Sequence, residues 1–327
     1  MAVLDTPEPI AGAGQVVLKV HDCGICGSDL HACQYDIGMP PDSIMGHEFC
    51  GEIQEIGAGV SGLKIGERVA GLPFVFCGEC DRCTSGMEIH CEKLKGLGLG
   101  QLPGAYAEFV ACPAASLFKL PDNVSSRAGA LVEPLSVGLH AVKRSRLKPQ
   151  MTVLVMGAGP IGLATLTWAK ARGARVVVSE LAEGRGNLAQ KLGADVIVNP
   201  REQNPTDKVR EMTGRYPDLV FECIGVKGTL SQAIGMLAPR SQVTEVGVCM
   251  EPDEIQPIQC ILREVDLNFV LGYDRADFDE TIAALASGKI KPQPMVTDVI
   301  SVEQVPAMFQ TLRQPGNHAK VMVEFPH

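Results

Sequence analysis

The second half of the chain alternates continuous apolar segments with amphipathic ones, and this alternation constrains the fold more than any other feature. It begins at about residue 137 and runs through "TVLVMG", "PIGLATLTWAKARG", "RVVVSE", "RGNLAQKLG", "DVIVN", "DLVFECIG", "TLSQAIGML" and "QVTEVGV". Continuous apolar runs are typical of strands buried on both faces, and amphipathic segments are typical of helices that cover them. The pattern therefore predicts a doubly wound parallel α/β sheet.

The first third of the chain has a different texture. Short segments rich in β-branched and aromatic residues are separated by glycine and proline, and we expect strands at 15–20, 51–57, 67–74 and 105–112. Short strands at this spacing predict a small β-barrel or sandwich. Near the end of the chain we expect helices at 277–289 and 302–313 and a last strand, "KVMVEF", that suits pairing with the first region.

Length and charge narrow the function classes. A chain of 327 residues is long enough for two domains of ordinary size. Its net charge of −9 would repel nucleic-acid phosphates and anionic lipid. Because we find no long apolar run and no leader-like start, we expect a cytoplasmic protein that binds neither nucleic acid nor membrane. In that compartment its 12 cysteines are more often metal ligands or buried thiols than disulfides.

The segment "VLVMGAGPIG" predicts a nucleotide site. Gly157, Gly159 and Gly162 directly follow an apolar strand and open a helix, so a pyrophosphate can approach the free N–H groups of the helix N-terminus. The next strand ends at Glu180, whose carboxylate can accept hydrogen bonds from ribose hydroxyls and would repel a 2′-phosphate. The pattern favours NAD over NADP, the alternative being a plain glycine turn beside a solvated glutamate. Arg185 could flank the adenine or be a surface arginine.

Four cysteines in "CGECDRCTSGMEIHC" have the spacing C-x2-C-x2-C-x7-C, at Cys77, Cys80, Cys83 and Cys91. Four thiolates on a short loop can close a tetrahedral shell around Zn²⁺ and leave no position for a substrate, so such a site is structural. An iron–sulfur cluster is the competing interpretation. In the bacterial ferredoxin run, however, the fourth cysteine follows sooner and precedes a proline, whereas Glu92 follows it here.

A second cluster could supply an open metal site. "HDCGICGSDLH" contains Cys26, "MGHEF" contains His47 and Glu48, and Glu133 lies in "ALVEPLSVGLHA" where the texture changes. Cysteine, histidine and glutamate with a water or a second carboxylate form a catalytic zinc site. Taken singly, these residues are as well explained as a buried thiol, a core histidine and a strand-edge carboxylate, and it is their combination that favours a metal.

Together, "GICGSDLH", "MGHEF", the four-cysteine run, "EPLSVGLHA" and "GAGPIG" make the chain resemble the zinc-dependent medium-chain alcohol and polyol dehydrogenases over nearly its whole length. Sorbitol, butanediol and threonine dehydrogenases are near relatives. The resemblance implies a GroES-like barrel domain, a Rossmann domain, an active site in the cleft between them, and a homodimer or homotetramer. The implied bounds are 1–136 for the GroES-like catalytic domain, 137–272 for the Rossmann NAD-binding domain and 273–327 for a return to the catalytic domain.

The resemblance also implies roles for single residues. Cys26, His47 and Glu48 would bind a catalytic zinc, and Glu133 would bind it directly or through water. Ser28 and His31 would pass the alcohol proton to solvent, while Asp29 is expected to be a structural acceptor and Cys23 a packing thiol. The residues expected to contact the cofactor are Gly157, Gly159, Pro160, Ile161, Gly162, Glu180, Arg185, Val246, Gly247, Val248 and Leu271.

The activity that the resemblance implies is oxidation of a secondary alcohol, or of a small diol or polyol, to a ketone with NAD. Sorbitol dehydrogenases place a tyrosine after the histidine that matches His31 and an arginine near 270–273, where this chain has Ala32 and Gly272. Because substrate hydroxyls without partners would be desolvated at a cost, a smaller, cyclic or less hydroxylated alcohol fits better, as in the butanediol branch. A threonine 3-dehydrogenase-like enzyme, a carbonyl reductase of the same fold and a non-catalytic binding protein are the alternatives.

Overall fold

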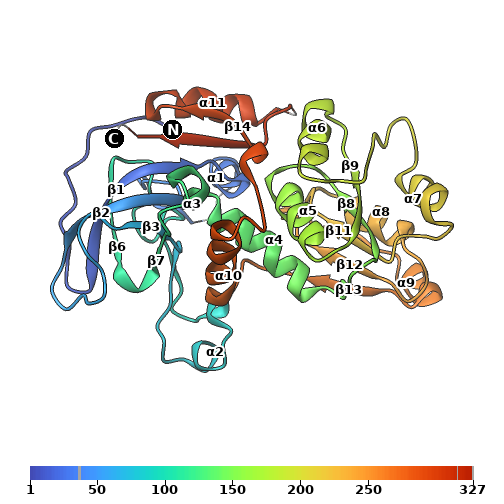
Figure 1. Cartoon of the computed structure of the whole chain (residues 1–327), viewed down its shortest axis with the longest axis horizontal. Helices are drawn as coiled ribbons and strands as arrows, with labels where there is room; N and C mark the ends of the chain where they lie inside the picture. Colours follow the sequence, from blue (N-terminus) through green and yellow to red (C-terminus); the bar gives the residue numbers. More distant parts are fainter. Residues whose placement is uncertain (36–37, 315, 326–327) are drawn as a thin grey trace.

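The alternating half of the chain forms a six-stranded parallel sheet in the computed structural model, which describes residues 1–35, 38–314 and 316–325 (Figure 1). The strand order is β10-β9-β8-β11-β12-β13, so the winding reverses between β8 and β11. The strands are β8 (Thr152–Met156), β9 (Arg175–Ser179), β10 (Val196–Val198), β11 (Leu219–Glu222), β12 (Gln242–Glu245) and β13 (Asp266–Phe269). The helices between them are α5 (Pro160–Ala171), α6 (Glu183–Lys191), α7 (Pro205–Thr213), α8 (Thr229–Met236) and α9 (Pro257–Arg263).

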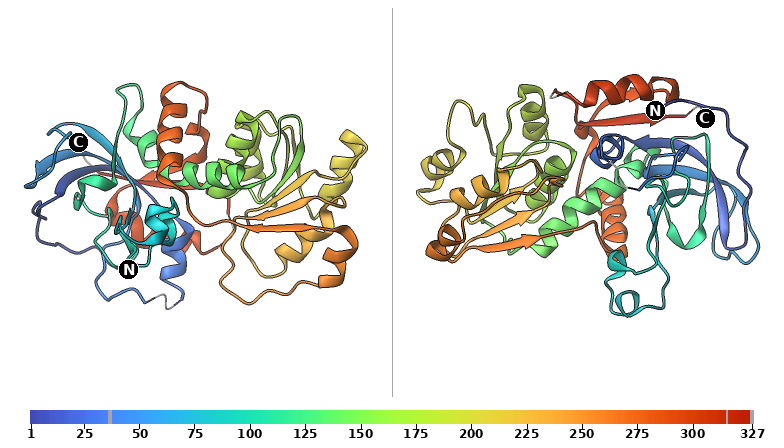
Figure 2. Two further views of the ribbon diagram at one scale, coloured as in Figure 1. Left: turned by 90° about the horizontal axis from the view of Figure 1, so that it is seen from below. Right: turned by 180° about the vertical axis from the view of Figure 1, so that it is seen from behind.

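Helices cover both faces of this sheet (Figure 2). In β8, Val153 and Val155 belong to the core cluster that contains α5, whereas Leu154 and Met156 belong to the cluster that contains α7 and α8. Successive side chains of a strand point to opposite faces. Both faces of β8 are therefore buried, which explains why the strand sequences are apolar throughout and confirms the predicted doubly wound sheet.

The other large sheet is mixed and has seven strands, ordered β14-β15-β1-β2-β3-β7, with β6 also pairing with β1. Among the described residues these pairings form an open path rather than a closed ring. The strands are β1 (Gln15–Gly24), β2 (Glu48–Ile56), β3 (Arg68–Gly71), β6 (Phe109–Pro113), β7 (Leu117–Lys119), β14 (Val296–Ile300) and β15 (Lys320–Glu324). The antiparallel pairing of β15 with β1 confirms the expected return of the last strand.

Further strands and helices complete the structure. A two-stranded sheet, β4 with β5, carries the cysteine loop, which projects from the body of the molecule (Figure 1). The remaining elements are α1 (Gly27–Ala32), β4 (Phe74–Val75), α2 (Asp81–Thr84), η1 (Glu88–His90), β5 (Lys95–Gly96), η2 (Ala114–Ser116), α3 (Ser126–Ala130), α4 (Val132–Arg144), α10 (Arg275–Ala286), η3 (Gln293–Met295), η4 (Val302–Gln304) and α11 (Val305–Leu312).

Some predicted boundaries differ from the structure. The strand expected at 67–74 ends at Gly71, and Pro73, which has no N–H to donate, separates it from β4. The helix expected at 277–289 begins at Arg275 because Asp274 caps it, and the segment at 302–313 begins with the 3₁₀ turn η4. We did not predict α7, whose cap is the Asn204 side chain accepting a hydrogen bond from the Thr206 N–H.

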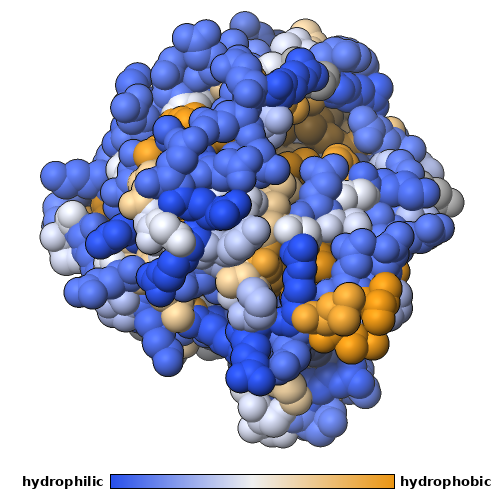
Figure 3. Space-filling model, turned by 90° about the vertical axis from the view of Figure 1, so that its right-hand side faces the viewer, coloured by the Kyte–Doolittle hydropathy of each residue, from blue (hydrophilic) through white to orange (hydrophobic). Residues whose placement is uncertain are grey.

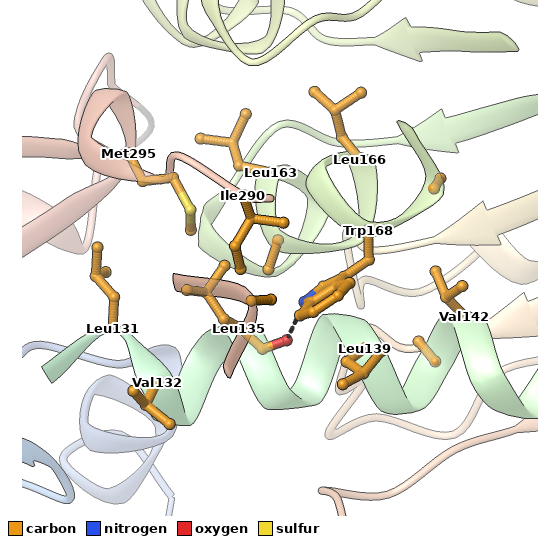
Figure 4. Close-up of a cluster of buried hydrophobic side chains, with 14 of the residues drawn as sticks. Leu131, Val132, Leu135, Leu139, Val142, Leu163, Leu166, Trp168, Ile290 and Met295 are labelled. Atoms are coloured by element: carbon orange, nitrogen blue, oxygen red, sulfur yellow. Dashed lines mark hydrogen bonds between the residues drawn. The ribbon is translucent and has the colours of Figure 1, made fainter. Parts of the chain in front are cut away.

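Helix α4 joins the two sheets, and the expected domain boundary at residue 136 falls inside it. It packs on α5 where Gly138 meets the backbone of Ala164 and Thr165, and the Trp168 indole donates a 2.8 Å hydrogen bond to the Leu135 carbonyl (Figure 4). The first turn of α4 carries Glu133. The packed body of the helix therefore fixes the position of that carboxylate.

Candidate functional site

The ends of β1 and β2 bring three metal-binding side chains together. Antiparallel pairing sets Gly24 at the end of β1 opposite Glu48 at the start of β2, so residues just beyond these ends become neighbours. Donor atoms of Cys26, His47 and Glu48 all lie within 4.8 Å of one another. Only glycine leaves room at position 24, because an added Cβ would lie 2.1 Å from Glu48 Oε2.

Asp29 lies behind His47 and faces its imidazole. It is fully buried in the first turn of α1, and its Oδ1 lies 3.3 Å from His47 Nδ1. Its Oδ2 accepts hydrogen bonds from the Cys26 N–H at 2.9 Å and the Tyr106 hydroxyl at 2.7 Å. Burial opposes a charged imidazole, yet Asp29 and Cys26 raise the pKa of His47 well above its usual value. With Nδ1 facing Asp29, Nε2 is the ring nitrogen left for a metal.

A lysine from the last strand faces Glu48. Lys320 is 1% exposed, and its Nζ lies 2.6 Å from both carboxylate oxygens of Glu48 and 3.0 Å from the Ile25 carbonyl oxygen. Burial alone would lower the pKa of Lys320, but the Glu48 carboxylate raises it. The strand pairing of β15 with β1 thus places a buried cation beside the candidate metal ligands.

Glu133 and Tyr273 connect this site to the parallel sheet. Tyr273 follows β13, and its hydroxyl donates a 2.9 Å hydrogen bond to Glu133 Oε1, both side chains being buried. Burial, and then the charge of Glu48, raises the pKa of Glu133 to about 7. Glu133 is therefore near enough to sense Glu48, although it stands outside the three converging donors.

Ser28 and His31 lie on α1, the helix that begins directly after Cys26. The Ser28 hydroxyl is exposed and its Oγ lies 3.8 Å from Cys26 Sγ. His31 is half-buried, and burial lowers its pKa below the usual value. Its imidazole is therefore neutral near pH 7 and able to accept a proton.

The donor set fits a zinc ion. Thiolate, imidazole and carboxylate are the ligands that zinc takes in catalytic sites with one open position. The partial exposure of Cys26 leaves one side of the set open.

The four predicted lobe cysteines converge as expected, with sulfurs within 4.8 Å of one another. Cys77 Sγ lies 3.9 Å from Cys83 Sγ, and Cys80 Sγ lies 4.0 Å from Cys91 Sγ. Ligand atoms about 2.3 Å from a tetrahedral zinc are separated by about 3.8 Å, so the cluster has the right size. The backbone N–H groups of Cys83 and Glu92 lower the pKa of Cys80 to about 6, which favours the thiolate that zinc requires.

A third group of possible ligands is already partnered. Asp277 Oδ2 lies 2.8 Å from His140 Nδ1 and accepts the Asp274 N–H, while its Oδ1 pairs with Lys143 at 2.7 Å. These bonds satisfy the carboxylate between α4 and α10. The group is thus a packing network between two helices.

The glycine turn after β8 leaves open space for a phosphate. Gly157 has a φ of +86°, which favours glycine, and an added Cβ at Gly162 would lie 2.0 Å from the Gly157 carbonyl oxygen. At Gly159, by contrast, an added Cβ would meet no atom within 4 Å. Pro160 begins α5, and the next N–H groups, of Ile161 and Gly162, lack partners within the helix.

Glu180 directly follows β9 at the same edge of the sheet, next to the glycine turn. Its carboxylate is 6% exposed and accepts hydrogen bonds from the N–H groups of Ala158 and Ala182, each at 2.8 Å. Arg185 pairs with it at 2.7 Å rather than projecting freely. Of the other residues expected near the cofactor, Val246 and Gly247 donate their N–H groups to the Glu222 carbonyl, and Val248 and Leu271 are exposed.

Sequence patterns missed Lys320 and Tyr273 as neighbours of the site and assigned Asp29 only a structural role. The one local signal for Lys320 was a lysine at the start of the apolar segment "KVMVEF". A lysine in a buried strand is almost always paired with an acidic group. Tyr273 lies two positions after Leu271, a residue expected to contact the cofactor, but nothing local indicates that its hydroxyl reaches Glu133.

Comparison with known proteins agrees with this geometry. The chain matches two family models, described as alcohol dehydrogenase GroES-like domain over residues 12–122 and zinc-binding dehydrogenase over residues 160–287. It is 34% identical over 327 residues to the sorbitol dehydrogenase of Bacillus subtilis (strain 168), a match that covers 97% of this chain and 92% of that one.

Solved structures are similar over the whole chain. The 2R,3R-butanediol dehydrogenase from Bacillus subtilis has a TM-score of 0.89 and 33% identity, covering 99% of this chain and 96% of that one. A protein of Sinorhizobium meliloti 1021, described as a zinc-binding dehydrogenase and solved bound to NADP, has a TM-score of 0.91 and 30% identity, with the same coverage.

Proposed function

The chain belongs to the zinc-binding, medium-chain dehydrogenase family, and on that basis we propose that it oxidises a secondary alcohol or small polyol to a ketone and reduces NAD. The observation that carries the proposal is the open donor set of Cys26, His47 and Glu48. It lies beside Glu133 and Tyr273, which connect it to the sheet whose glycine turn would bind the nucleotide.

Each step of the proposed chemistry has residues to perform it. Cys26, His47 and Glu48 would hold a catalytic zinc, with Glu133 close by, and zinc supplies a Lewis acid that favours the alkoxide near neutral pH. Ser28 would accept the alcohol proton, and His31 would pass it to solvent. The four-cysteine lobe would hold a second, structural zinc.

We infer a preference for NAD over NADP. The buried carboxylate of Glu180 lies beside the glycine turn, and its negative charge would repel the 2′-phosphate of a ribose bound there. Arg185 pairs with Glu180, which supports the argument because that guanidinium is engaged rather than free for a phosphate. Dissociation constants for NADH and NADPH, measured by cofactor fluorescence, would test the preference. Equal dissociation constants would refute it.

The substrate that we propose is a small or weakly hydroxylated secondary alcohol. Gly272 has a φ of +56°, and an added Cβ would lie 3.2 Å from Ile89, so this position is unsuited to a long polar side chain. Together with Ala32, it leaves a polyol with fewer partners. A panel of 2,3-butanediol, cyclic alcohols, sorbitol and threonine, followed by NADH absorbance, would decide, and faster oxidation of sorbitol than of any simple secondary alcohol would refute this choice.

We also propose that two copies associate through the free edge of the parallel sheet. β13 is the last strand in the order, and α9 beside it exposes Ile258, Ile261 and Leu262 by 57%, 68% and 76%. An apolar patch is visible at this end of the molecule (Figure 3). An unpaired strand edge with adjacent apolar side chains suits pairing with a second copy. Light scattering of wild type and Leu262→Glu would test it, and a monomeric wild type would contradict it.

The cellular setting and the domain bounds are also proposals. The 12 cysteines are all free, which suits the reducing cytoplasm. In the described part of the chain, no helix combines the length and the apolar character needed to cross a membrane. We keep 1–136, 137–272 and 273–327 as the catalytic, NAD-binding and returning segments, and limited proteolysis would test these bounds.

A further inference from the structure

Two glutamates end neighbouring strands at the edge of the parallel sheet where the nucleotide would bind. Glu222 is the last residue of β11, Glu245 is the last residue of β12, and the two are paired across the ladder. Glu222 is fully buried and Glu245 is 9% exposed. Neither belongs to the candidate zinc site or to the glycine turn, so the chemistry described above leaves this pair unexplained.

Glu222 is placed to carry a negative charge. Its Oε1 accepts a hydrogen bond from the Ile224 N–H at 2.9 Å, and its Oε2 accepts one from the Gly225 N–H at 3.1 Å. Backbone donors of this kind stabilise the ionised form of a carboxyl group. Glu222 therefore acts as an acceptor that fixes the start of the 223–228 segment.

Glu245 has no such donors. Its Oε2 is buried and receives no hydrogen bond from the residues that the structure describes, while the register of β11 and β12 sets Glu245 directly beside Glu222. The titratable groups that face it are Glu222 of β11, the Cys223 thiol directly after β11, and Asp253 of the segment before α9. Burial, and then the charge of Glu222, raises the pKa of Glu245 to about 8. A proton on Glu245 would satisfy both carboxyl groups, because two contacting carboxylates cannot both ionise at low cost.

The pair supports two segments that lie against each other. An added Cβ at Gly225 would lie 2.5 Å from the Val248 nitrogen, and one at Gly247 would lie 2.6 Å from Glu222 Oε2. The segments 223–228 and 246–248 therefore rest on each other and on the Glu222 carboxylate. Both follow the carboxyl ends of central strands, where ligands of such sheets bind.

We propose that Glu245 and Glu222 share one proton, and that this proton positions the 223–228 and 246–248 segments for nucleotide binding. The inference rests on the proposed binding of NAD to this edge. When the proton is lost, two like charges meet in a buried contact and drive the segments apart. Nucleotide affinity then falls, through positioning and without any direct contact between Glu245 and the reacting atoms.

The test compares NADH affinity across pH in wild type, Glu245→Gln and Glu245→Val, with NADH fluorescence as the signal from about pH 6 to about pH 10. We expect wild-type affinity to fall about tenfold at alkaline pH, which corresponds to one unit of pKa difference between free and bound protein. The amide of Gln donates to Glu222 at every pH, so this variant keeps neutral-pH affinity and loses the alkaline decline. Val cannot donate and binds weakly throughout. Parallel profiles for wild type and Gln would overturn the proposal.

A second readout needs no nucleotide. The pKa of Glu245 is about 8 in the folded chain against 4.5 for an unperturbed group, so the folded state binds its proton more tightly. This tighter proton binding contributes to the free energy of unfolding at low pH, and the contribution is lost as pH rises from about 4.5 to about 8. We expect wild type to lose unfolding free energy there relative to Glu245→Gln, and parallel curves would refute the shared proton.

The two readouts separate this inference from the function on which it rests. If wild type binds no NADH at any pH, the proposed NAD binding fails, while the unfolding curves still decide whether the proton is shared. Glu264→Gln is the matched control, because Glu264 is exposed and pairs with Arg240 on the same lobe. It should leave both profiles unchanged.

Discussion

Asp29 is the residue on which the geometry of the candidate zinc site most depends. One of its oxygens faces His47, and the other holds the Cys26 N–H and the Tyr106 hydroxyl. A single carboxylate thus fixes the position of two of the three converging donors. Partners of this kind set the tautomer and basicity of a metal-binding histidine and so contribute to metal affinity.

Replacing Asp29 by Asn should therefore weaken zinc binding while leaving all three ligands in place. The amide removes the negative charge beside His47 Nδ1, and we expect a loss of about 10- to 100-fold in zinc affinity, with a matching loss of activity at limiting zinc. Competition with a metal chelator measures the affinity. Tyr106→Phe is the control, since it removes one bond to Asp29 but keeps the charge, and an equal loss in both variants would contradict the argument.

The sequence motifs brought attention to Cys26, His47 and Glu48, and the structure places their donor atoms within 4.8 Å of one another, while their binding of a metal stays a prediction. The motifs were insufficient for the partners of these donors. Lys320 reaches Glu48 across 272 positions and Tyr273 reaches Glu133 across 140. Contacts of this separation depend on strand pairing and helix packing, which local patterns do not specify.

At the scale of elements, α4 and α5 approach closely where α4 has a glycine. An added Cβ at Gly138 would lie 2.6 Å from the Ala164 carbonyl carbon and 2.7 Å from the Thr165 nitrogen. These are backbone atoms, so relief requires the two helices to move apart. The separation would also disturb the Trp168 bond to Leu135 and, through the helix, the position of Glu133 (Figure 4).

We expect Gly138→Ala to lower the free energy of unfolding by about 1–3 kcal/mol, the usual range for overpacking a core. Gly235→Ala is the matched control, because Gly235 lies in α8 and an added Cβ there would meet nothing within 4 Å. That change should stabilise the protein by about 0.5–1 kcal/mol, since alanine loses less entropy in a helix. Urea unfolding measures both changes. An unchanged free energy of unfolding for Gly138→Ala would show that α4 and α5 can accommodate the added methyl group.

The cysteine lobe tests a different kind of element, one with little apolar interior. Its helix α2 spans only Asp81–Thr84 and buries none of its residues, so a bound zinc would supply most of its folding energy. Cys80→Ser should lower the melting temperature by about 5 °C or more. Cys33→Ser, at an exposed thiol outside the lobe, should not. If both variants have the melting temperature of wild type, a metal does not stabilise the lobe.

At the scale of the whole molecule, the pattern of apolar segments predicted the parallel sheet because both faces of its strands are buried. The mixed sheet was predicted less completely. Its strands β7 (Leu117–Lys119) and β14 (Val296–Ile300) are short and carry no strong alternation. The return of β15 to β1 was expected from its composition alone, but its register, which sets the position of Lys320, is a product of the assembled fold.

That register places Lys320 of β15 against Glu48 of β2, so the pair tests how strongly the last strand stabilises the first part of the chain. Replacing Lys320 by Met leaves a buried carboxylate without its cation, and we expect the metal-free protein to lose about 3–5 kcal/mol of unfolding free energy. Adding Glu48→Gln removes the orphaned charge, so the double variant should recover most of the loss. Urea unfolding after chelation measures this cycle, and losses that simply add would mean that the two side chains are uncoupled. With zinc restored to Lys320→Met, we expect a smaller loss, because the bound cation would offset the same carboxylate charge.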